Sequence, residues 1–222
     1  MSQFVRDVVL PIARVIDNQW VGLLGSGFLV SPDNLLVTAR HVIDGAVDAQ
    51  ALVVRNGEWL GFELRQIWTS EREDIAVCEL VGLPKQDPSW LRLASIDLHS
   101  SATYDAWGYP EDVLYDFARR DEVGRMLQMP DLVFTQGYVR RRFSENIPGL
   151  RGRAFVELSD VAGSGCSGGP LITARGKTWT VSGIYVGERV TETGEGVRRE
   201  RGIALRLADV AEEIAQLGRG LI

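Results

Sequence analysis

Gly165-Cys166-Ser167-Gly168-Gly169-Pro170 is the most informative segment of this 222-residue chain. Three glycines and a proline surround its serine. Glycine adopts backbone conformations that other residues avoid, and it lets a bound molecule approach main-chain N–H groups closely. A nucleophilic serine beside an oxyanion hole, a pair of N–H donors that stabilises developing negative charge, needs both properties. The segment therefore predicts that Ser167 is a nucleophile.

Two segments closer to the N-terminus supply the groups that such a serine requires. Thr38-Ala39-Arg40-His41-Val42 contains a histidine, and Glu73-Asp74-Ile75-Ala76-Val77 contains an aspartate. A serine hydroxyl is a poor nucleophile at neutral pH, so it needs a base within hydrogen-bond distance and a group that orients that base. We predict that His41 is the general base and then the general acid, and that Asp74 fixes the imidazole tautomer.

Other residues fit these roles less well. Asp97 and Asp160 are alternatives to Asp74, but neither precedes a strand-like Ile-Ala-Val run. We expect His99 to be an ordinary surface histidine. Residues 165–169 also fit the Gly-x-Ser-x-Gly turn of α/β-hydrolases, but that fold places its acid and its histidine after the serine, and no histidine follows here.

With these blocks in this order, the chain resembles trypsin/chymotrypsin-like serine peptidases, and it is closer to bacterial single-domain and HtrA-type members than to digestive enzymes. Residues 25–32 with 36–41 resemble the family's histidine block, 74–77 its aspartate block and 165–170 its serine block. The resemblance implies an all-β fold of two six-stranded β-barrels with the site in the cleft between them. It also implies a hydrolase that cleaves peptide bonds through an acyl-enzyme intermediate.

The resemblance also assigns the oxyanion hole and the pocket for the residue before the scissile bond. The oxyanion donors are the N–H groups of Gly165 and Ser167. The substrate-binding residues are Val161, Ala162, Tyr185, Val186, Gly187 and Gly202. An apolar floor at Val161 favours a small or medium apolar side chain, whereas a one-residue shift would place Asp160 there and favour Arg or Lys. Both preferences stay open.

One position departs from the digestive members. In those members, an aspartate directly before the nucleophile pairs with a newly cut N-terminus. In this chain the corresponding residue is Cys166. We therefore expect no activation by N-terminal clipping. Either the site is constitutively formed, or something else orders residues 163–165. HtrA-type members carry a C-terminal PDZ domain, and none is expected in this chain.

Short β-type runs separated by turn residues fill most of the sequence, as in an all-β protein. The expected strands are 8–15, 21–30, 35–38, 51–54, 59–68 and 75–80, then 103–107, 132–139, 154–158, 170–173, 178–186 and 202–207. We predict a single domain over 1–222. It comprises a first barrel over 1–83, a crossover over 84–101, a second barrel over 102–207 and a C-terminal helix over 208–218.

The composition limits the partners. A net charge of −6 disfavours nucleic acid or an anionic membrane as the main partner. No apolar run is long enough to span a bilayer, and the N-terminus lacks a signal-peptide core, so we expect a cytoplasmic protein. Two cysteines are too few for a disulfide framework, and we expect Cys78 to be a core residue. The histidines and cysteines have no metal-ligand spacing, and no cofactor is implied.

We expect a protein or peptide substrate. Three charged segments, 110–131, 140–142 with Arg151 and Arg153, and 188–201, are interpreted as solvated loops, or else as docking sites for a regulatory protein or a larger assembly. A catalytically silent peptide-binding module on the same fold is the main alternative function. An ester hydrolase is a third interpretation.

Overall fold

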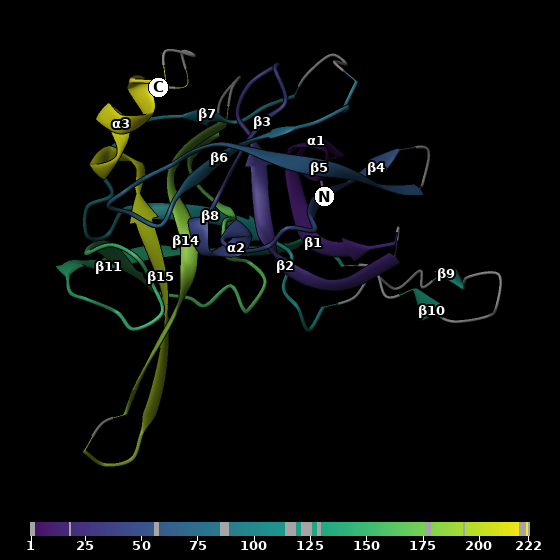
Figure 1. Cartoon of the computed structure of the whole chain (residues 1–222). Helices are drawn as coiled ribbons and strands as arrows, with labels where there is room; N and C mark the ends of the chain where they lie inside the picture. The colour runs from purple at the N-terminus through teal and green to yellow at the C-terminus, as the bar shows by residue number, and fades with distance from the viewer. Residues whose placement is uncertain are drawn as a thin grey trace.

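The computed structural model describes residues 3–17, 19–55, 58–84, 89–113, 119–120, 126–127, 130–175, 179–192, 194–217 and 221. Strands dominate these residues, and the helices are short (Figure 1). The helical segments are α1 (Gln3–Val8), α2 (Arg40–Ile43), α3 (Ala211–Ala215) and the 3₁₀ helix η1 (Leu207–Asp209). None of the helices in these ranges is long and apolar enough to cross a membrane.

Six strands of the N-terminal half form a closed barrel. They are β1 (Val9–Ile16), β2 (Gln19–Leu29), β3 (Leu35–Thr38), β4 (Ala49–Arg55), β5 (Glu58–Thr69) and β6 (Ala76–Leu80). Their spatial order is β1-β2-β3-β6-β5-β4, and the pairing of Ile12 in β1 with Ala51 in β4 closes the ring. Neighbouring strands run antiparallel, and β3 is buried along its whole length.

The chain from residue 92 onward forms a second sheet. Its strands are β7 (Arg92–Leu93), β8 (Thr103–Gly108), β11 (Val133–Ser144), β12 (Ala154–Leu158), β13 (Pro170–Arg175), β14 (Trp179–Glu192) and β15 (Arg198–Arg206). Because β13 pairs with both β8 and β14, six of these strands follow one another in a ring, β13-β8-β11-β12-β15-β14. The short strand β7 joins β14 in parallel.

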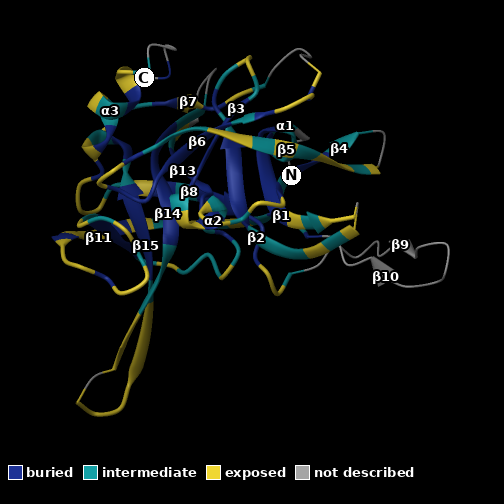
Figure 2. Ribbon diagram, in the orientation of Figure 1, coloured by how far each residue is buried: buried dark blue, intermediate teal, exposed yellow. Residues whose placement is uncertain are grey.

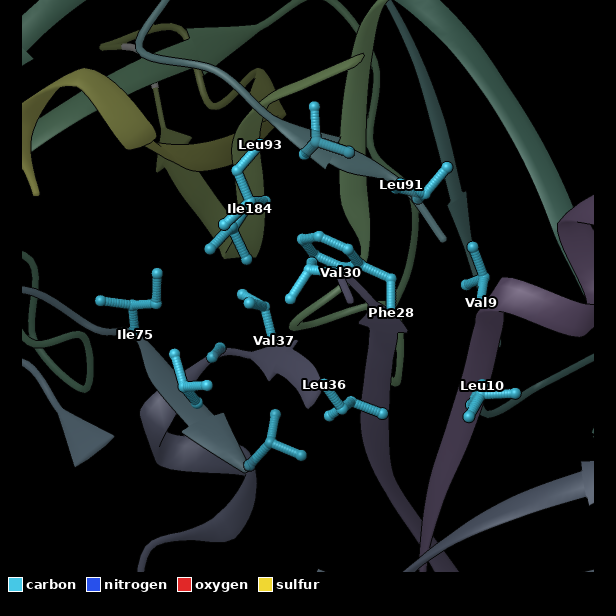
Figure 3. Close-up of a cluster of buried hydrophobic side chains, with 14 of the residues drawn as sticks. Val9, Leu10, Phe28, Val30, Leu36, Val37, Ile75, Leu91, Leu93 and Ile184 are labelled. Carbon is cyan, nitrogen blue, oxygen red and sulfur yellow. The ribbon is translucent and has the colours of Figure 1, made fainter. Parts of the chain in front are cut away.

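The hydrophobic core passes from one barrel to the other. Phe28 and Val37 are buried residues of strands β2 and β3 in the first barrel, and the close-up in Figure 3 shows them beside Leu91, Leu93 and Ile184. The last three come from the chain before and within β7 and from β14. Figure 2 shows this buried interior beneath an exposed periphery. The two barrels therefore share one continuous apolar cluster. This cluster holds together the two halves between which the predicted site lies.

The double β-barrel fold predicted from the sequence is confirmed, and each of the twelve expected strands corresponds to a strand of the structure. Three segments differ. Residues 140–142, interpreted from the sequence as a solvated loop, lie within strand β11. The segment 188–201 was expected to be a loop, but β14 and β15 continue through it as a two-stranded ribbon that projects from the body (Figure 1). The crossover 84–101 contains strand β7.

Two further segments lie partly outside the described residues. The region of the expected helix 208–218 holds η1 and the shorter α3, and residue 218 lies outside the described residues. Most of the loop 110–131 also lies outside them. Its described part includes the paired strands β9 (Arg119–Arg120) and β10 (Met126–Leu127).

Candidate active site

The imidazole of His41 and the carboxylate of Asp74 make two contacts. Nδ1 of His41 lies 2.5 Å from Oδ2 of Asp74, and the backbone N–H of His41 donates to Oδ1 at 2.9 Å. The Asp74 side chain is 1% exposed, whereas that of His41 is 36% exposed. A buried carboxylate therefore holds a ring whose remaining surface reaches solvent.

The first barrel itself brings these two residues together. His41 lies in α2, directly after β3, and Asp74 lies in the turn before β6. Because β3 and β6 are neighbours with Thr38 opposite Ala76, the end of one strand lies beside the start of the other. Arg40 fastens the two turns, since its N–H donates to the carbonyl oxygen of Asp74 at 3.3 Å.

Ser167 lies in a tight turn between β12 and β13. Left-handed φ angles of +97°, +92° and +89° occur in this turn at Gly163, Gly165 and Gly168. Space is also short, because a Cβ at Gly168 would lie 2.1 Å from the carbonyl oxygen of Ser26 and 2.9 Å from the nitrogen of Ala39. Glycine therefore lets the turn pack directly onto the chain that leads into α2.

Gly25 lies between the serine turn and α2. A Cβ at Gly25 would lie 2.6 Å from a methyl group of Val42 and 2.8 Å from the carbonyl oxygen of Ser167. Val42 follows His41 directly, so the nucleophile candidate and the base candidate lie on segments that meet at this glycine. The structure thus brings the segments of the predicted triad together at the border of the two barrels.

Ser26, a fully buried residue of β2, ties the serine turn to the first barrel. Its N–H donates to the carbonyl oxygen of Ser167 at 2.8 Å, and its hydroxyl donates to the carbonyl oxygen of Gly165 at 2.9 Å. The same hydroxyl accepts a hydrogen bond of 2.9 Å from the N–H of Tyr109. One residue therefore holds two carbonyl groups of the turn in fixed directions, that of Gly165 through its hydroxyl and that of Ser167 through its backbone N–H.

The N–H groups of the serine turn fall into two sets. Those of Cys166, Gly168 and Gly169 donate hydrogen bonds of 3.1, 2.7 and 2.9 Å to backbone carbonyls. Within the described part of the chain, those of Gly165 and Ser167 donate to no protein acceptor. These two donors are the ones that the sequence assigns to the oxyanion hole.

The peptide bond between Ser164 and Gly165 has a defined direction. The carbonyl oxygen of Ser164 accepts a 2.6 Å hydrogen bond from the N–H of Glu111, and the Ser164 hydroxyl donates to the Glu111 carboxylate at 3.1 Å. In a trans peptide the C=O and N–H bonds point in opposite directions. The contact with Glu111 therefore turns the N–H of Gly165 away from Glu111.

One known family matches most of this chain. The family described as trypsin-like peptidase domain matches residues 25–184, a range that includes His41, Asp74 and Ser167. The chain belongs to this family.

One curated relative of this trypsin-like peptidase domain is named "Probable periplasmic serine endoprotease DegP-like" and comes from Pseudomonas fluorescens. The two are 28% identical over 172 residues, which make up 74% of this chain and 31% of the relative. A second relative, "Putative serine protease HhoA" from Synechocystis, is 28% identical over 176 residues, or 78% of this chain and 39% of the relative. The chain thus spans well under half of the length of these relatives.

A solved structure of similar fold is the MamO protease domain from Magnetospirillum magneticum. It has a TM-score of 0.66 at 16% identity, and the match covers 96% of this chain and 98% of that one. A second, the HtrA-type protease AlgW with a decapeptide, has a TM-score of 0.66 at 19% identity and covers 98% and 67%. At these identities the likeness shows the fold alone, which is that of protease domains of the trypsin-like kind.

Among the predicted substrate-binding residues of this trypsin-like domain, Tyr185 and Gly202 are packed closely together. The Tyr185 hydroxyl accepts a hydrogen bond from the N–H of Ala162 and donates one to Glu188, both at 3.2 Å. A Cβ at Gly202 would lie 3.0 Å from the Tyr185 ring and 2.4 Å from the carbonyl oxygen of Asp160. Burial strongly raises the pKa of Tyr185, so its hydroxyl stays protonated and serves as this link.

The remaining substrate-binding candidates differ in exposure. Val161, Ala162 and Gly187 are half-buried. Val186 is fully buried in the core cluster, so only its backbone is available to a substrate. Strand β13 pairs with β14 only as far as Ile184, and within the described residues the same edge of β14 has no partner strand beyond that point. Tyr185, the next residue, bonds on this edge to Gly168 and Gly169, and beyond it the described part of the edge has no partner strand.

Asp160 has its own partners. Its Oδ2 accepts a 3.0 Å hydrogen bond from the hydroxyl of Ser159, and a Cβ at Gly137 of β11 would lie 3.0 Å from the same oxygen. The carboxylate therefore lies against β11.

Cys166 is a buried thiol rather than a second nucleophile. It is 2% exposed, and its Sγ donates to the carbonyl oxygen of Ala162 at 3.1 Å. Burial, followed by the negative charges of Glu188 and Asp112, raises the pKa of this thiol to about 12. Since the thiolate is the reactive species, Cys166 is chemically quiet at neutral pH. Its neighbour Ser167 is the reactive candidate of the turn.

The competing residues lie elsewhere. His99 is exposed and its Nδ1 contacts the carbonyl oxygen of Ser100 at 2.9 Å, as expected for a surface histidine. Asp97 forms ion pairs with Arg142 and Arg206.

The sequence did not predict that Ser26 holds the serine turn through hydrogen bonds. Its only local signal was its place between two glycines in the histidine block, which did not identify its partners.

Proposed function

We propose that this chain is a serine endopeptidase that cleaves peptide bonds through Ser167, His41 and Asp74. The observation that carries the proposal is the pair of contacts from Asp74 to His41, on a segment against which the glycine-rich turn of Ser167 is packed. A buried carboxylate on Nδ1 leaves Nε2 as the proton acceptor.

The proposed reaction has two halves. Nε2 of His41 takes the hydroxyl proton of Ser167 while Oγ bonds to the carbonyl carbon of the scissile peptide bond. The tetrahedral intermediate then breaks its C–N bond, and the imidazolium gives its proton to the departing amine. Water attacks the acyl-enzyme by the same route, which releases the new carboxyl end and restores Ser167.

The N–H groups of Gly165 and Ser167 are proposed as the oxyanion hole. Two features support this: neither group has a protein acceptor among the described residues, and the contact between Ser164 and Glu111 fixes the direction of the first. Preorganised donors of this kind stabilise the intermediate without reorganising during the reaction. Loss of one such donor lowers the rate by about 10²–10³.

We also propose that the site is formed at rest. Cys166 excludes the N-terminal ion pair of digestive members, and the hydrogen bonds from Ser26 and Glu111 supply a different tether for residues 163–165. This tether depends on no cleavage of the chain. The cytoplasmic location and a regulatory partner, both expected from the sequence, stay predictions.

For the residue before the scissile bond we propose a small or medium apolar side chain. The support is that Asp160, the group that would favour Arg or Lys, is engaged by Ser159 against β11. The AlgW structures contain a decapeptide and a tripeptide, and we propose that peptides are the ligands here as well.

The test is digestion of a peptide library by the purified protein, with cleavage sites located by mass spectrometry. The proposal predicts internal cuts after apolar residues, and no cuts by Ser167→Ala. Peptides that bind but stay intact in the parent would favour the silent binding module. Turnover of esters without turnover of peptides would favour the ester hydrolase.

A further inference from the structure

Five arginines line one hollow of about 330 Å³ on the second barrel. The hollow lies over the neighbouring strands β11, β12, β15 and β14, and its lining residues are Arg140, Arg141, Glu157, Arg189, Thr191, Arg199 and Arg201. We call this the arginine hollow. In a chain with a net charge of −6, five guanidinium groups around one carboxylate are a local reversal of sign.

The carboxylates near the hollow do not balance these charges. Glu157 pairs with Arg140 at 3.5 Å and with Arg141 at 3.0 Å. Arg189 pairs with Glu145 at 2.8 Å. Among the described residues, Arg199 and Arg201 have no carboxylate partner. The hollow therefore has more positive charges than neighbouring carboxylates.

The register of the β14–β15 ribbon places like charges opposite each other on this face. Arg189 lies directly opposite Arg201, and Thr191 opposite Arg199. Like charges in cross-strand positions destabilise a sheet. On the other face of the same ribbon, Arg198 lies opposite Glu192 and pairs with Glu200 at 2.7 Å. The uncompensated charge is thus confined to the face that forms the hollow.

The hollow adjoins the edge at which a peptide is proposed to pair. Arg189 lies two residues beyond Gly187 on β14, about 7 Å at the usual rise per residue. The free edge of β14 begins after Tyr185, whose N–H and carbonyl bond to Gly169 and Gly168, and it continues past this arginine within the described residues. A residue of an added strand opposite Arg189 presents its side chain to the same face as Arg189, within reach of the hollow.

We propose that the arginine hollow binds the carboxylates of acidic residues that lie about four positions before the scissile bond of a polypeptide substrate. This rests on the proposed function and adds a substrate class to it. Guanidinium groups bind carboxylates through paired, charge-assisted hydrogen bonds. The position follows because the chain from Tyr185, whose carbonyl accepts from Gly168 beside the nucleophile, to Arg189 spans four residues.

Binding is measured first with Ser167→Ala, so that no cleavage occurs. Two fluorescently labelled peptides are compared by anisotropy at low ionic strength. They share an apolar residue before the cleavage site and differ only in three glutamates or three glutamines upstream. We expect about tenfold tighter binding of the glutamate peptide. The difference should shrink as salt is added, because the ion pairs are partly exposed.

The variant Arg199→Gln/Arg201→Gln should bring the two affinities within about twofold, while its thermal unfolding midpoint stays near that of the parent. The matched control is Arg14→Gln/Arg92→Gln, which removes the same charge at exposed positions of β1 and β7 and should keep the preference. Equal binding of both peptides by Ser167→Ala would overturn the proposal. So would an equal loss of preference in both double variants, since that would assign the attraction to net charge.

Turnover of the glutamine peptide by the parent separates the two hypotheses. Cleavage of that peptide with no preference for glutamate would support the proposed function and contradict the proposed role of the arginine hollow. A glutamate preference in binding without any cleavage would support carboxylate binding by the arginine hollow and contradict the proposed peptidase activity.

Discussion

The hydroxyl of Ser26 donates a hydrogen bond of 2.9 Å to the carbonyl oxygen of Gly165, which lies 139 residues further along the chain. Both groups lie where the two barrels meet, and the Ser26 residue is fully buried. Because Gly165 supplies one proposed oxyanion donor, this bond links the first barrel to the electrostatics of the site.

Removing the hydroxyl of Ser26 should therefore impair catalysis more than binding. In Ser26→Ala, the N–H of Tyr109 and the carbonyl oxygen of Gly165 lose a buried partner, which costs about 1–3 kcal/mol. We expect kcat to fall about tenfold or more while KM changes little, measured with a peptide that the parent cleaves.

Ser182→Ala is the matched control for this variant. Ser182 is also a fully buried serine, and its hydroxyl bonds to that of Thr173 at 2.7 Å within the second barrel. It should lower the thermal unfolding midpoint to a similar extent and leave kcat near that of the parent. Equal losses of kcat in both variants would assign the effect of Ser26→Ala to general destabilisation.

Replacing Asp74 by asparagine should remove most of the activity and leave the fold intact. An amide cannot hold the imidazole in the tautomer that exposes Nε2 as a base. Such a change in a Ser-His-Asp triad lowers kcat by about 10⁴. The measurement is steady-state hydrolysis by Asp74→Asn beside Asp97→Asn. Asp97 was the alternative to Asp74 in the sequence, and it pairs with Arg142 and Arg206 instead of a histidine. Activity near that of the parent is therefore expected for the second variant.

Both cysteines should be unreactive in the folded protein. Cys78 and Cys166 are 0% and 2% exposed, and burial raises the pKa of each thiol to about 12. A colorimetric thiol titration should detect no reactive group in native protein at neutral pH and two groups in denaturant. Rapid alkylation of native protein, with loss of activity, would show that the serine turn opens in solution.

Glu73 should destabilise the fold at neutral pH. The Glu73 residue is 9% exposed, and its burial is the main cause of a raised carboxyl pKa. The negative charges of Asp209 and Glu213 also raise this pKa, whereas backbone hydrogen bonds from Arg153 and Ala154 oppose the rise. A raised folded-state pKa means that the protonated form is favoured in the native protein. The stability that the protonated Glu73 carboxyl group contributes is complete at pH values below its unfolded-state pKa. That stability is lost as the pH rises through its folded-state pKa.

Glu73→Gln should therefore raise the thermal unfolding midpoint by roughly 1–3 °C near pH 8, and the gain should vanish near pH 4. Calorimetry across this range provides the measurement. The control is the exposed Glu71→Gln, two residues away, which should change the midpoint little at either pH. A gain for Glu73→Gln that is constant with pH would contradict the role of ionisation.

The sequence predicted the strands and the triad segments because both leave local signatures. Alternating or buried apolar runs mark β1 to β6, and short blocks of fixed composition mark His41, Asp74 and Ser167. The ribbon formed by β14 and β15 was missed because both of its faces meet solvent, so its residues show no apolar alternation (Figure 2). Contacts such as that between Ser26 and Gly165 depend on tertiary folding and have no local pattern.

The most direct test of the account is labelling of the purified, unprocessed protein with a fluorophosphonate probe, which reacts with a serine only when its base and oxyanion hole are assembled. The account predicts that the parent is labelled at rest, and that Ser167→Ala and His41→Ala are not. Labelling that persists in Ser167→Ala, or a folded parent that takes up no probe, would contradict it.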